Sequence, residues 1–142
     1  MKLLPEHLIP YTPYKLKVYD SVSKTAKIMN LGQGASNNWV GVKTVLNYYK
    51  KGSFIYKPIL RPLSDLKKIF EVDGKKIHPI SILQSTSPYI MAEENGFVDY
   101  VSGKYIYVHN LSYWIVLQLM EWHFDVRGLI KHDLAIDINT LE

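Results

Sequence analysis

The sequence predicts one α+β domain over residues 1–142, in which an N-terminal antiparallel β-meander packs with a central aromatic helix near the C-terminus, flanked by short helices. Three observations predict this class. Residues 14–20 alternate apolar and charged side chains, as a half-buried strand does. Residues 111–125 are apolar around most of a helical circumference, which is typical of a helix buried against a sheet or in an interface. A chain of 142 residues suits one domain that buries roughly two-thirds of its unfolded surface.

The N-terminal half has the pattern of successive strands. In residues 14–20, Leu16 and Val18 are expected to point inward and Lys17 outward. Residues 31–38 are rich in Gly, Ser and Asn, which predicts a long connection within the sheet and not a domain boundary. Three or four antiparallel strands are expected, at residues 14–20, 25–31, 39–46 and 53–60.

Short elements follow the meander. Pro62 and Ser64 are expected to open a helix, and the Asp-Gly pair at residues 73–74 marks the turn after it. The Ser-Gly pair at residues 102–103 marks the turn of a small hairpin. The expected elements are a helix at 63–70, a strand at 75–80, a helix at 81–85, a hairpin of residues 97–101 and 104–108, and a last strand at 134–138.

The helix predicted over residues 111–125 follows Asn110, a residue type that caps helices well. Core packing is the expected role of Trp114 and Trp122, and contact with a partner is the alternative. Gly128 ends the segment. The polar positions of the helix form one narrow stripe: Gln118, Glu121 and Asp125.

Basic and acidic residues are segregated along the chain. Residues 1–76 hold 14 basic and five acidic residues, a net charge of +9, whereas residues 77–142 hold three basic and eight acidic residues, a net charge of −5. This asymmetry points to a polyanionic or acidic partner. A second candidate surface flanks acids in the C-terminal half and consists of Tyr89, Tyr100, Tyr105 and Tyr107.

Several functional classes are disfavoured by composition. The chain has no cysteine, which excludes disulfides, thiol catalysis and thiolate metal sites. No apolar run approaches the roughly 20 residues that span a bilayer, and the N-terminus lacks the pattern of a signal peptide. We therefore expect a soluble, intracellular protein without a membrane partner.

The basic half is the candidate binding surface. Tyrosines and Trp39 offer flat faces to unpaired bases, with stacking worth about 1–3 kcal/mol per base, and lysines supply salt-dependent phosphate contacts. Because lysine outnumbers arginine, recognition of backbone and shape is favoured over reading of sequence. Two alternatives stay open, a surface for an acidic protein and a solvated sheet face whose lysines prevent edge-to-edge aggregation. The candidate binding residues are Lys15, Lys17, Lys27, Trp39, Lys43, Tyr48, Tyr49, Lys50, Lys51, Lys57, Arg61, Lys67 and Lys68.

No motif argues for catalysis, so we expect no enzyme, no catalytic residue, no metal and no cofactor. Gly32-Gln33-Gly34 lacks the rest of a dinucleotide or phosphate-loop motif, and no serine lies in a nucleophile motif. A cluster of histidines and acids near the C-terminus lacks any metal-binding spacing: His123, Asp125, His132, Asp133 and Asp137. A metal-dependent nuclease is the least favoured alternative and would use Glu121, His123, Asp125 and Asp137.

Two stretches carry a resemblance, residues 57–66 (KPILRPLSDL) and residues 111–140, which include EWHFDVRGLI at 121–130 and LAIDINT at 134–140. Together they resemble a group of small proteins from phages and prophages of Bacteroidetes bacteria. Residues 3–5 and 14–17 match loosely, and residues 20–55 lie outside the resemblance. No activity is known for the group, so it assigns no site residue.

The resemblance implies a phage accessory protein that works in the cytoplasm of a bacterial host. Combined with the basic, tyrosine-rich half, it favours a non-enzymatic inhibitor that binds a host-defence nucleoprotein, in the manner of an anti-CRISPR protein. The alternative is an accessory of phage replication or recombination that binds DNA or RNA directly.

Overall fold

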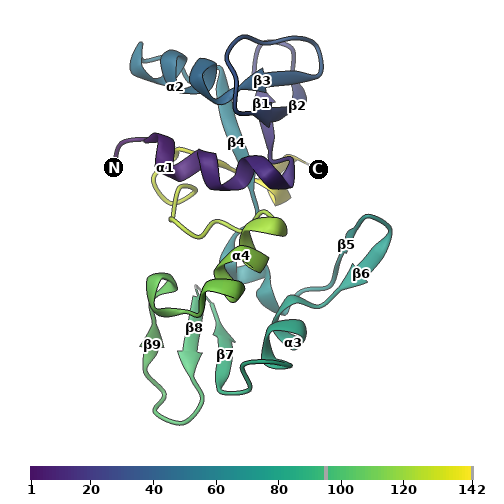
Figure 1. The fold of residues 1–142 in the computed structure, drawn as a ribbon, viewed down its shortest axis with the longest axis vertical. Coiled ribbons are helices and arrows are strands. Elements are labelled where there is room, and N and C mark those ends of the chain that lie inside the picture. Colours follow the sequence, from purple (N-terminus) through teal and green to yellow (C-terminus); the bar gives the residue numbers. More distant parts are fainter. Residues whose placement is uncertain (95, 142) are drawn as a thin grey trace. The chain divides into compact units, whose positions relative to one another are not determined.

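The computed structural model describes residues 1–94 and 96–141, and within them the chain forms two compact units. Unit 1 comprises Met1–Arg61 and Arg127–Glu142, and unit 2 comprises Pro62–Val126. In Figure 1, unit 1 runs from purple to blue and ends in yellow, and unit 2 runs from teal to green. Helices and strands occur in both units, which confirms the predicted α+β class. The expected single domain stays a prediction.

Unit 1 contains a five-stranded sheet with the order β10-β4-β1-β2-β3. Strand β1 pairs antiparallel with β2 and with β4, but β2–β3 and β4–β10 are parallel pairs. The purely antiparallel meander was therefore wrong, and the sheet is mixed. Its strands are β1 (Lys17–Asp20), β2 (Thr25–Asn30), β3 (Trp39–Gly41), β4 (Tyr56–Leu60) and β10 (Ile136–Asp137), and η4 (Ile138–Leu141) follows β10.

The loop at residues 31–38 causes the parallel pairing. It runs back along β2, so that β3 starts beside Ile28 and follows the direction of β2. Within the loop, Ala35 forms a bridge to Val40, and the Gly41 N–H donates to the Gly34 carbonyl at 2.8 Å. The loop therefore pairs with β3 and is not a simple hairpin connection.

Helix α2 (Val42–Lys50) replaces most of the strand predicted over residues 39–46. Its buried residues are Val42, Val45 and Leu46, a spacing of three and four that a helix brings to one face. The β-branched residues and the alternating run before them favoured a strand, but burial of this face decides for a helix. Figure 1 shows α2 beside the strands of unit 1.

The chain starts with helix α1 (Pro5–Leu8) and the 3-10 helix η1 (Ile9–Tyr14), which the sequence pattern did not predict. His7 is only 7% exposed, and its Nδ1 accepts a hydrogen bond from the Leu4 N–H at 3.0 Å. Burial, with a smaller contribution from the positive charge of Arg127, lowers the pKa of the His7 imidazole below its ordinary value. The neutral ring is thus the form that fits the fold.

This environment predicts a loss of stability in mild acid. A depressed folded-state pKa leaves stability intact above the ordinary histidine pKa, about 6.5, and removes it as the pH falls through the lower folded value. The free energy of unfolding should therefore drop as the pH falls below about 7. Urea unfolding of the protein and of His7→Gln measures this drop, and the variant, which cannot titrate, should lose less stability. An equal loss in both proteins would assign the acid sensitivity to another group.

Unit 2 begins with the 3-10 helix η2 (Leu63–Lys67), which is shorter than the helix predicted over residues 63–70. The Asp-Gly pair at residues 73–74 forms the turn between strands β5 and β6, which pair as a hairpin. The predicted hairpin around residues 102–103 is present as β8 and β9, in a three-stranded sheet of order β7-β8-β9. The elements before the last helix are η2 (Leu63–Lys67), β5 (Phe70–Val72), β6 (Lys75–Ile77), α3 (Pro79–Gln84), β7 (Ile90–Glu93), β8 (Gly96–Asp99), β9 (Tyr105–Ile106) and η3 (Val108–Asn110).

The aromatic helix is α4 (Tyr113–Glu121) in unit 2, shorter than predicted and preceded by Ser112 at the N-cap position. Asn110 instead ends η3, so the predicted cap was wrong. Trp122 is 7% exposed, as expected for the core, but Trp114 is 38% exposed, contrary to expectation. Packing of this helix with the N-terminal sheet stays a prediction.

Candidate nucleic-acid interface

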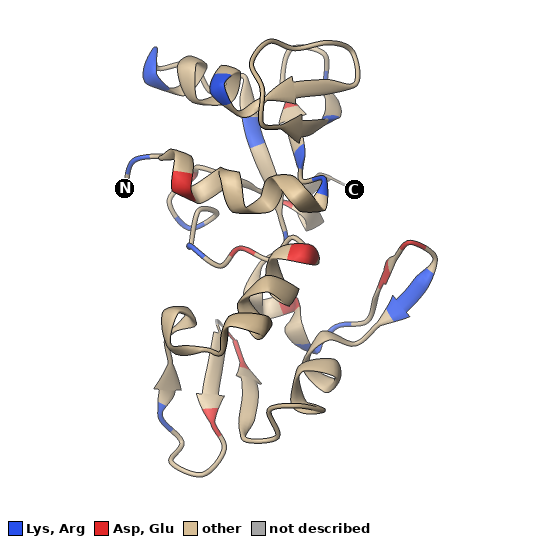
Figure 2. Ribbon diagram, viewed as in Figure 1, with Lys and Arg blue, Asp and Glu red and all other residues tan. Residues whose placement is uncertain are grey.

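The two units differ in the sign of their charge. Unit 1 contains 12 basic and five acidic residues, a net charge of +7, and unit 2 contains five basic and eight acidic residues, a net charge of −3. Figure 2 shows basic residues on α2, on β4 and on the β1–β2 hairpin of unit 1. The charge asymmetry of the sequence is therefore also an asymmetry between compact units, which makes unit 1 the candidate polyanion-binding part.

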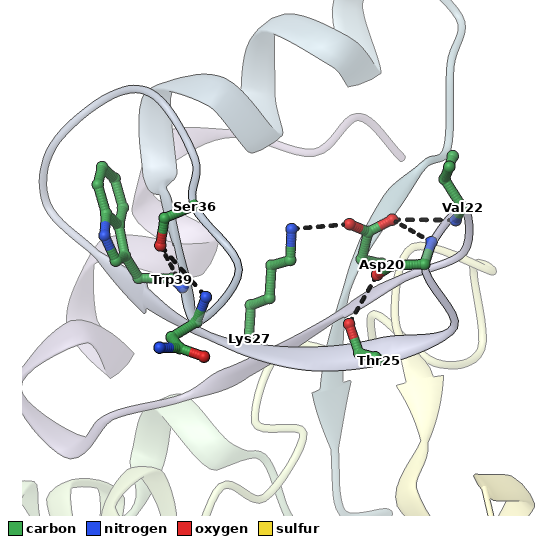
Figure 3. Close-up of polar contacts among 8 residues, drawn as sticks. Asp20, Val22, Thr25, Lys27, Ser36 and Trp39 are labelled. Atoms are coloured by element: carbon green, nitrogen blue, oxygen red, sulfur yellow. Dashed lines mark hydrogen bonds and ion pairs between the residues drawn. The ribbon is translucent and has the colours of Figure 1, made fainter.

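Lys27, one of the predicted binding residues, is buried and points away from solvent. Its Nζ lies 2.9 Å from the Asp20 carboxylate and 5.8 Å from the centre of the Tyr56 ring, and the Lys27 residue is 8% exposed. Figure 3 shows the lysine extended toward Asp20. This prediction was wrong, because Lys27 lies on the same face of the sheet as the buried Val18. The ion pair, not a ligand, neutralises its charge.

Asp20 also organises the turn between β1 and β2. One carboxylate oxygen accepts hydrogen bonds from the N–H groups of Val22 at 2.9 Å and Ser23 at 3.2 Å, and the other faces Lys27. Burial opposes ionisation of Asp20, but the Lys27 ammonium and the two backbone donors outweigh it and lower the pKa of the carboxyl group. The hydrogen bond to Asp20 raises the pKa of Lys27 in turn. Both residues are charged at neutral pH and serve the fold.

The opposite side of the sheet, here called the outer face, consists of Lys17, Tyr19, Ala26, Ile28, Trp39 and Lys57. Strand register places two rows of side chains across it, Lys17–Ile28–Trp39 and Lys57–Tyr19–Ala26, because paired residues on adjacent strands point to the same side. Ile28 and Trp39 are 41% and 38% exposed, and Lys17 is also exposed. The outer face is therefore a basic surface with an accessible indole at its edge.

Trp39 is held in place by the loop that precedes it. Its backbone N–H donates to the Ser36 Oγ at 3.3 Å, and the same oxygen accepts from the Asn38 N–H at 3.2 Å (Figure 3). A Cβ atom built on Gly34 would lie 3.7 Å from the end of the indole ring. The loop thus fixes the Trp39 backbone, and Gly34 lies near one end of the ring, while the residue as a whole remains 38% exposed.

Lys57, in the second row, is engaged within unit 1. Its Nζ lies 3.0 Å from the Asp133 carboxylate and 5.1 Å from the centre of the Phe54 ring. The Asp133 side chain is 91% exposed, so this pair lies at the surface and contributes little to stability. Lys17 forms no ion pair with any residue in the described ranges, 1–94 and 96–141, and is the available cation of the outer face.

Helix α2 presents a second group of predicted residues. Lys43 and Lys50 lie seven positions apart on its exposed side, and Lys51 follows at the C-cap. Tyr48 and Tyr49 are engaged in edge-to-face contacts, Tyr48 with Tyr56 at 5.4 Å and Tyr49 with Phe54 at 5.6 Å between ring centres. The lysines are exposed for phosphate contact. Both tyrosines contact neighbouring rings, Tyr49 is partly buried, and Tyr48 remains 39% exposed.

The remaining predicted residues lie elsewhere. Lys15 is exposed after η1, where its φ is 55°, and Arg61 follows β4 and is partly buried. Lys67 and Lys68 belong to unit 2, and Lys68 pairs with Asp65 at 3.0 Å. The structure therefore brings Lys17 and Trp39 together on one face and groups the α2 lysines, but it does not place all thirteen residues on one compact unit.

The glycine-rich loop has a structural role that the sequence pattern did not reveal. The Gly32 carbonyl accepts the Lys43 N–H at 3.2 Å, and the Thr44 Oγ1 accepts the Gly34 N–H at 2.6 Å. The loop thereby provides an acceptor for one N–H group in the first turn of α2 and lies against that turn. The two glycines of residues 32–34 could have indicated a close backbone approach, but the helix that they approach was predicted as a strand.

The acids and histidines near the C-terminus divide between the units, with His123 and Asp125 in unit 2 and the others in unit 1. Asp133 faces Lys57, and Asp137 accepts the Asn139 N–H at 2.9 Å. No group of three His, Cys, Asp or Glu residues suited to a metal ion is found in residues 1–94 and 96–141. The arrangement gives the nuclease alternative no positive support.

The tyrosines of unit 2 form an exposed series. The Tyr105 and Tyr107 rings lie 5.2 Å apart between centres, and Tyr107 stacks on His109 at 5.5 Å with 14° between the ring planes. Tyr89 and Tyr100 are 63% and 68% exposed. These residues stay a candidate protein-binding surface.

Comparison with family models, with curated proteins and with solved structures gave no match to this chain. Across the residues that the structure describes, every helix is too short or too polar to cross a membrane. Function must therefore be argued from the surface of the molecule, and the resemblance to phage proteins stays a prediction.

Proposed function

We propose that this chain is a non-enzymatic binding protein that engages a nucleoprotein, with unit 1 contacting nucleic-acid phosphates. The observation that carries the proposal is the division of charge between compact units, +7 on unit 1 and −3 on unit 2. Phosphate-dominated binding needs clustered cations but no catalytic group. Exposed lysines on α2 and the outer face supply these cations, and the exposed tyrosines of unit 2 supply aromatic side chains of the type enriched in protein interfaces.

The biological form of this proposal is an inhibitor of a host-defence nucleoprotein, such as a CRISPR effector, carried by a phage. The resemblance to phage proteins supports that context. The second candidate, an accessory that binds DNA or RNA directly, rests on the same basic unit and needs no protein partner. Affinity purification of the tagged chain from its host, with and without nuclease treatment, separates the two. A protein that stays bound after nuclease supports inhibition, and nucleic acid alone supports direct binding.

The exposed lysines predict a salt-dependent affinity that falls when their charge is removed. Replacing both Lys50 and Lys51 with alanine should weaken binding at low salt and lower the slope of log affinity against log salt by about 0.7–0.9 for each lost phosphate contact. Fluorescence anisotropy with labelled oligonucleotides over a salt series measures this slope.

Lys75 and Lys76 offer a matched control, because they are also adjacent and exposed but belong to the acidic unit 2. Alanine at these two positions should leave the slope unchanged. An equal change in both double variants would show that net charge, and not the α2 lysines, sets the affinity. If neither single- nor double-stranded oligonucleotides bind at low salt, direct contact with nucleic acid is refuted.

A further inference from the structure

The outer face of the unit 1 sheet combines features that a duplex does not require. Trp39 lies on β3, an edge strand, and the residue is 38% exposed. Contact with phosphates alone would be served by lysines, and an exposed tryptophan would add nothing to it. An accessible aromatic ring beside an available lysine is instead the combination that binds unpaired bases.

The register of the strands fixes how these groups are spaced. Trp39 pairs with Ile28, and Ile28 pairs with Lys17, so the three side chains form one row across β3, β2 and β1. Two strand spacings separate the indole from the lysine, about 10 Å at the backbone. Ile28 lies between them and is 41% exposed, so it extends the apolar surface beside the indole.

The row is fixed by the fold before any ligand arrives. The loop at residues 31–38 holds the Trp39 backbone through Ser36, and at Gly34 it passes near the end of the indole ring. On the other side of the sheet, the charge of Lys27 is neutralised by Asp20, so Lys27 is not a second binding site for a phosphate. The only exposed cation of the row is Lys17, which forms no ion pair within residues 1–94 and 96–141.

We propose that the row Lys17–Ile28–Trp39 is a binding site for single-stranded nucleic acid, in which an unpaired base stacks on Trp39 and a neighbouring phosphate contacts Lys17. This inference rests on the proposed function and narrows it from nucleic acid in general to strands with unpaired bases. Because every base has a flat face, the site discriminates against duplex and not between sequences. Guide RNAs and displaced DNA strands share this chemistry.

The test compares the affinity of the full chain for a labelled oligothymidine with that for its duplex with oligoadenine, at low salt. The single strand is expected to bind more tightly. Trp39→Ala should weaken single-strand binding roughly 5- to 150-fold, the range that corresponds to one stacked base, and Trp39→Phe should restore part of it. Lys17→Ala should lower the salt slope by about 0.7, the value for one contact to a single strand.

Matched controls lie in unit 2. Trp114 has the same exposed fraction as Trp39, 38%, and Lys104 is exposed, so Trp114→Ala and Lys104→Ala should leave the affinity unchanged. Circular dichroism and thermal unfolding confirm that each variant is folded. A Trp114→Phe background keeps Trp39 and the buried Trp122 as emitters. Quenching by the bound strand should appear in this background and disappear when Trp39→Phe is added, which is a signal that a merely structural role would not produce.

The outcomes separate the inference from the proposed function. Equal affinity for single strand and duplex, with no effect of Trp39→Ala in a folded variant, overturns the stacking site but leaves a phosphate-binding unit 1. Loss of affinity on Trp114→Ala equal to that on Trp39→Ala also overturns it. Failure of both single strand and duplex to bind removes direct nucleic-acid contact and the inference together.

Discussion

Alanine at Gly41 is expected to destabilise unit 1 by at least about 3 kcal/mol, near or above the upper end of overpacking penalties. A Cβ at this position would overlap the carbonyl group of Gly32 and would lie 2.5 Å from the Gln33 Cα. All of these are backbone atoms, so no side chain can rotate away. The same carbonyl accepts the Lys43 N–H, and Gly41 itself donates to Gly34, so moving the loop breaks the contacts that start α2.

Chemical unfolding followed by far-ultraviolet circular dichroism measures this effect. Gly52→Ala is the control, because Gly52 has a φ of +79° but nothing within 4 Å of the position that a methyl group would take. That variant should lose about 1–2 kcal/mol from backbone strain alone. A loss at Gly41 no larger than the loss at Gly52 would show that the loop relaxes freely and does not hold Trp39 in place.

Asparagine at Asp20 is expected to cost about 3 kcal/mol of unfolding free energy. The amide keeps an oxygen for the N–H groups of Val22 and Ser23, but it leaves the Lys27 ammonium buried without a counter-charge. Removing one partner of a buried ion pair typically costs about 3–5 kcal/mol, and the side chains, 7% and 9% exposed, place this pair near the lower end. Lys27→Met should cost about 1.5–3 kcal/mol, the usual value for one hydrogen bond to a charged group, because Asp20 keeps its two backbone donors.

A double-mutant cycle tests this assignment. The Asp20→Asn/Lys27→Met variant removes both charges and should recover to within about 1 kcal/mol of the wild type. Asp133→Asn is the exposed counterpart, since it removes the acid that faces Lys57, and it should change stability by less than about 1 kcal/mol. Additive losses in the double variant would mean that the two side chains do not act as a pair.

The contribution of the Asp20–Lys27 pair to the stability of unit 1 depends on pH. The lowered pKa of Asp20 contributes stability above the ordinary aspartate value, and this stability is lost as the pH falls through the lower folded value. The raised pKa of Lys27 contributes stability below the ordinary lysine value, and this stability is lost as the pH rises through the higher folded value. The ion pair therefore stabilises the fold over the whole neutral range.

The sequence predicted the elements whose signal is local. Alternation over residues 14–20 located β1, and the Ser-Gly turn at residues 102–103 located the β8–β9 hairpin. It could not predict the parallel pairs of the sheet, because a loop that runs back along its own strand leaves no periodic pattern. The sequence pattern also predicted a strand where α2 forms. Three apolar residues at helical spacing in a segment of nine residues are a weak signal when their neighbours are β-branched.

For the candidate site, the sequence likewise predicted which residues are charged but not which of them are exposed. Composition located the basic half but could not distinguish Lys27 from Lys17. Lys27 is buried in an ion pair, whereas Lys17 is exposed. Strand register decides between them, because residues one position apart point to opposite faces. Trp39 could be named from the sequence as an aromatic among lysines, whereas its place in a row with Lys17 depends on the parallel pairing of β2 and β3.

The insertion of unit 2 between β4 and β10 affects how the protein is made. These two strands are neighbours in one sheet, yet all of residues 62–126 separate them along the chain. During synthesis, β1 to β4 leave the ribosome first, and unit 2 then emerges whole while the sheet still lacks its last strand. The sheet of unit 1 is thus completed late, through a pairing of high sequence separation that folds slowly. Until then the free edge of β4 is exposed, and the proline at its centre, Pro58, which lacks an N–H group, limits pairing with other chains.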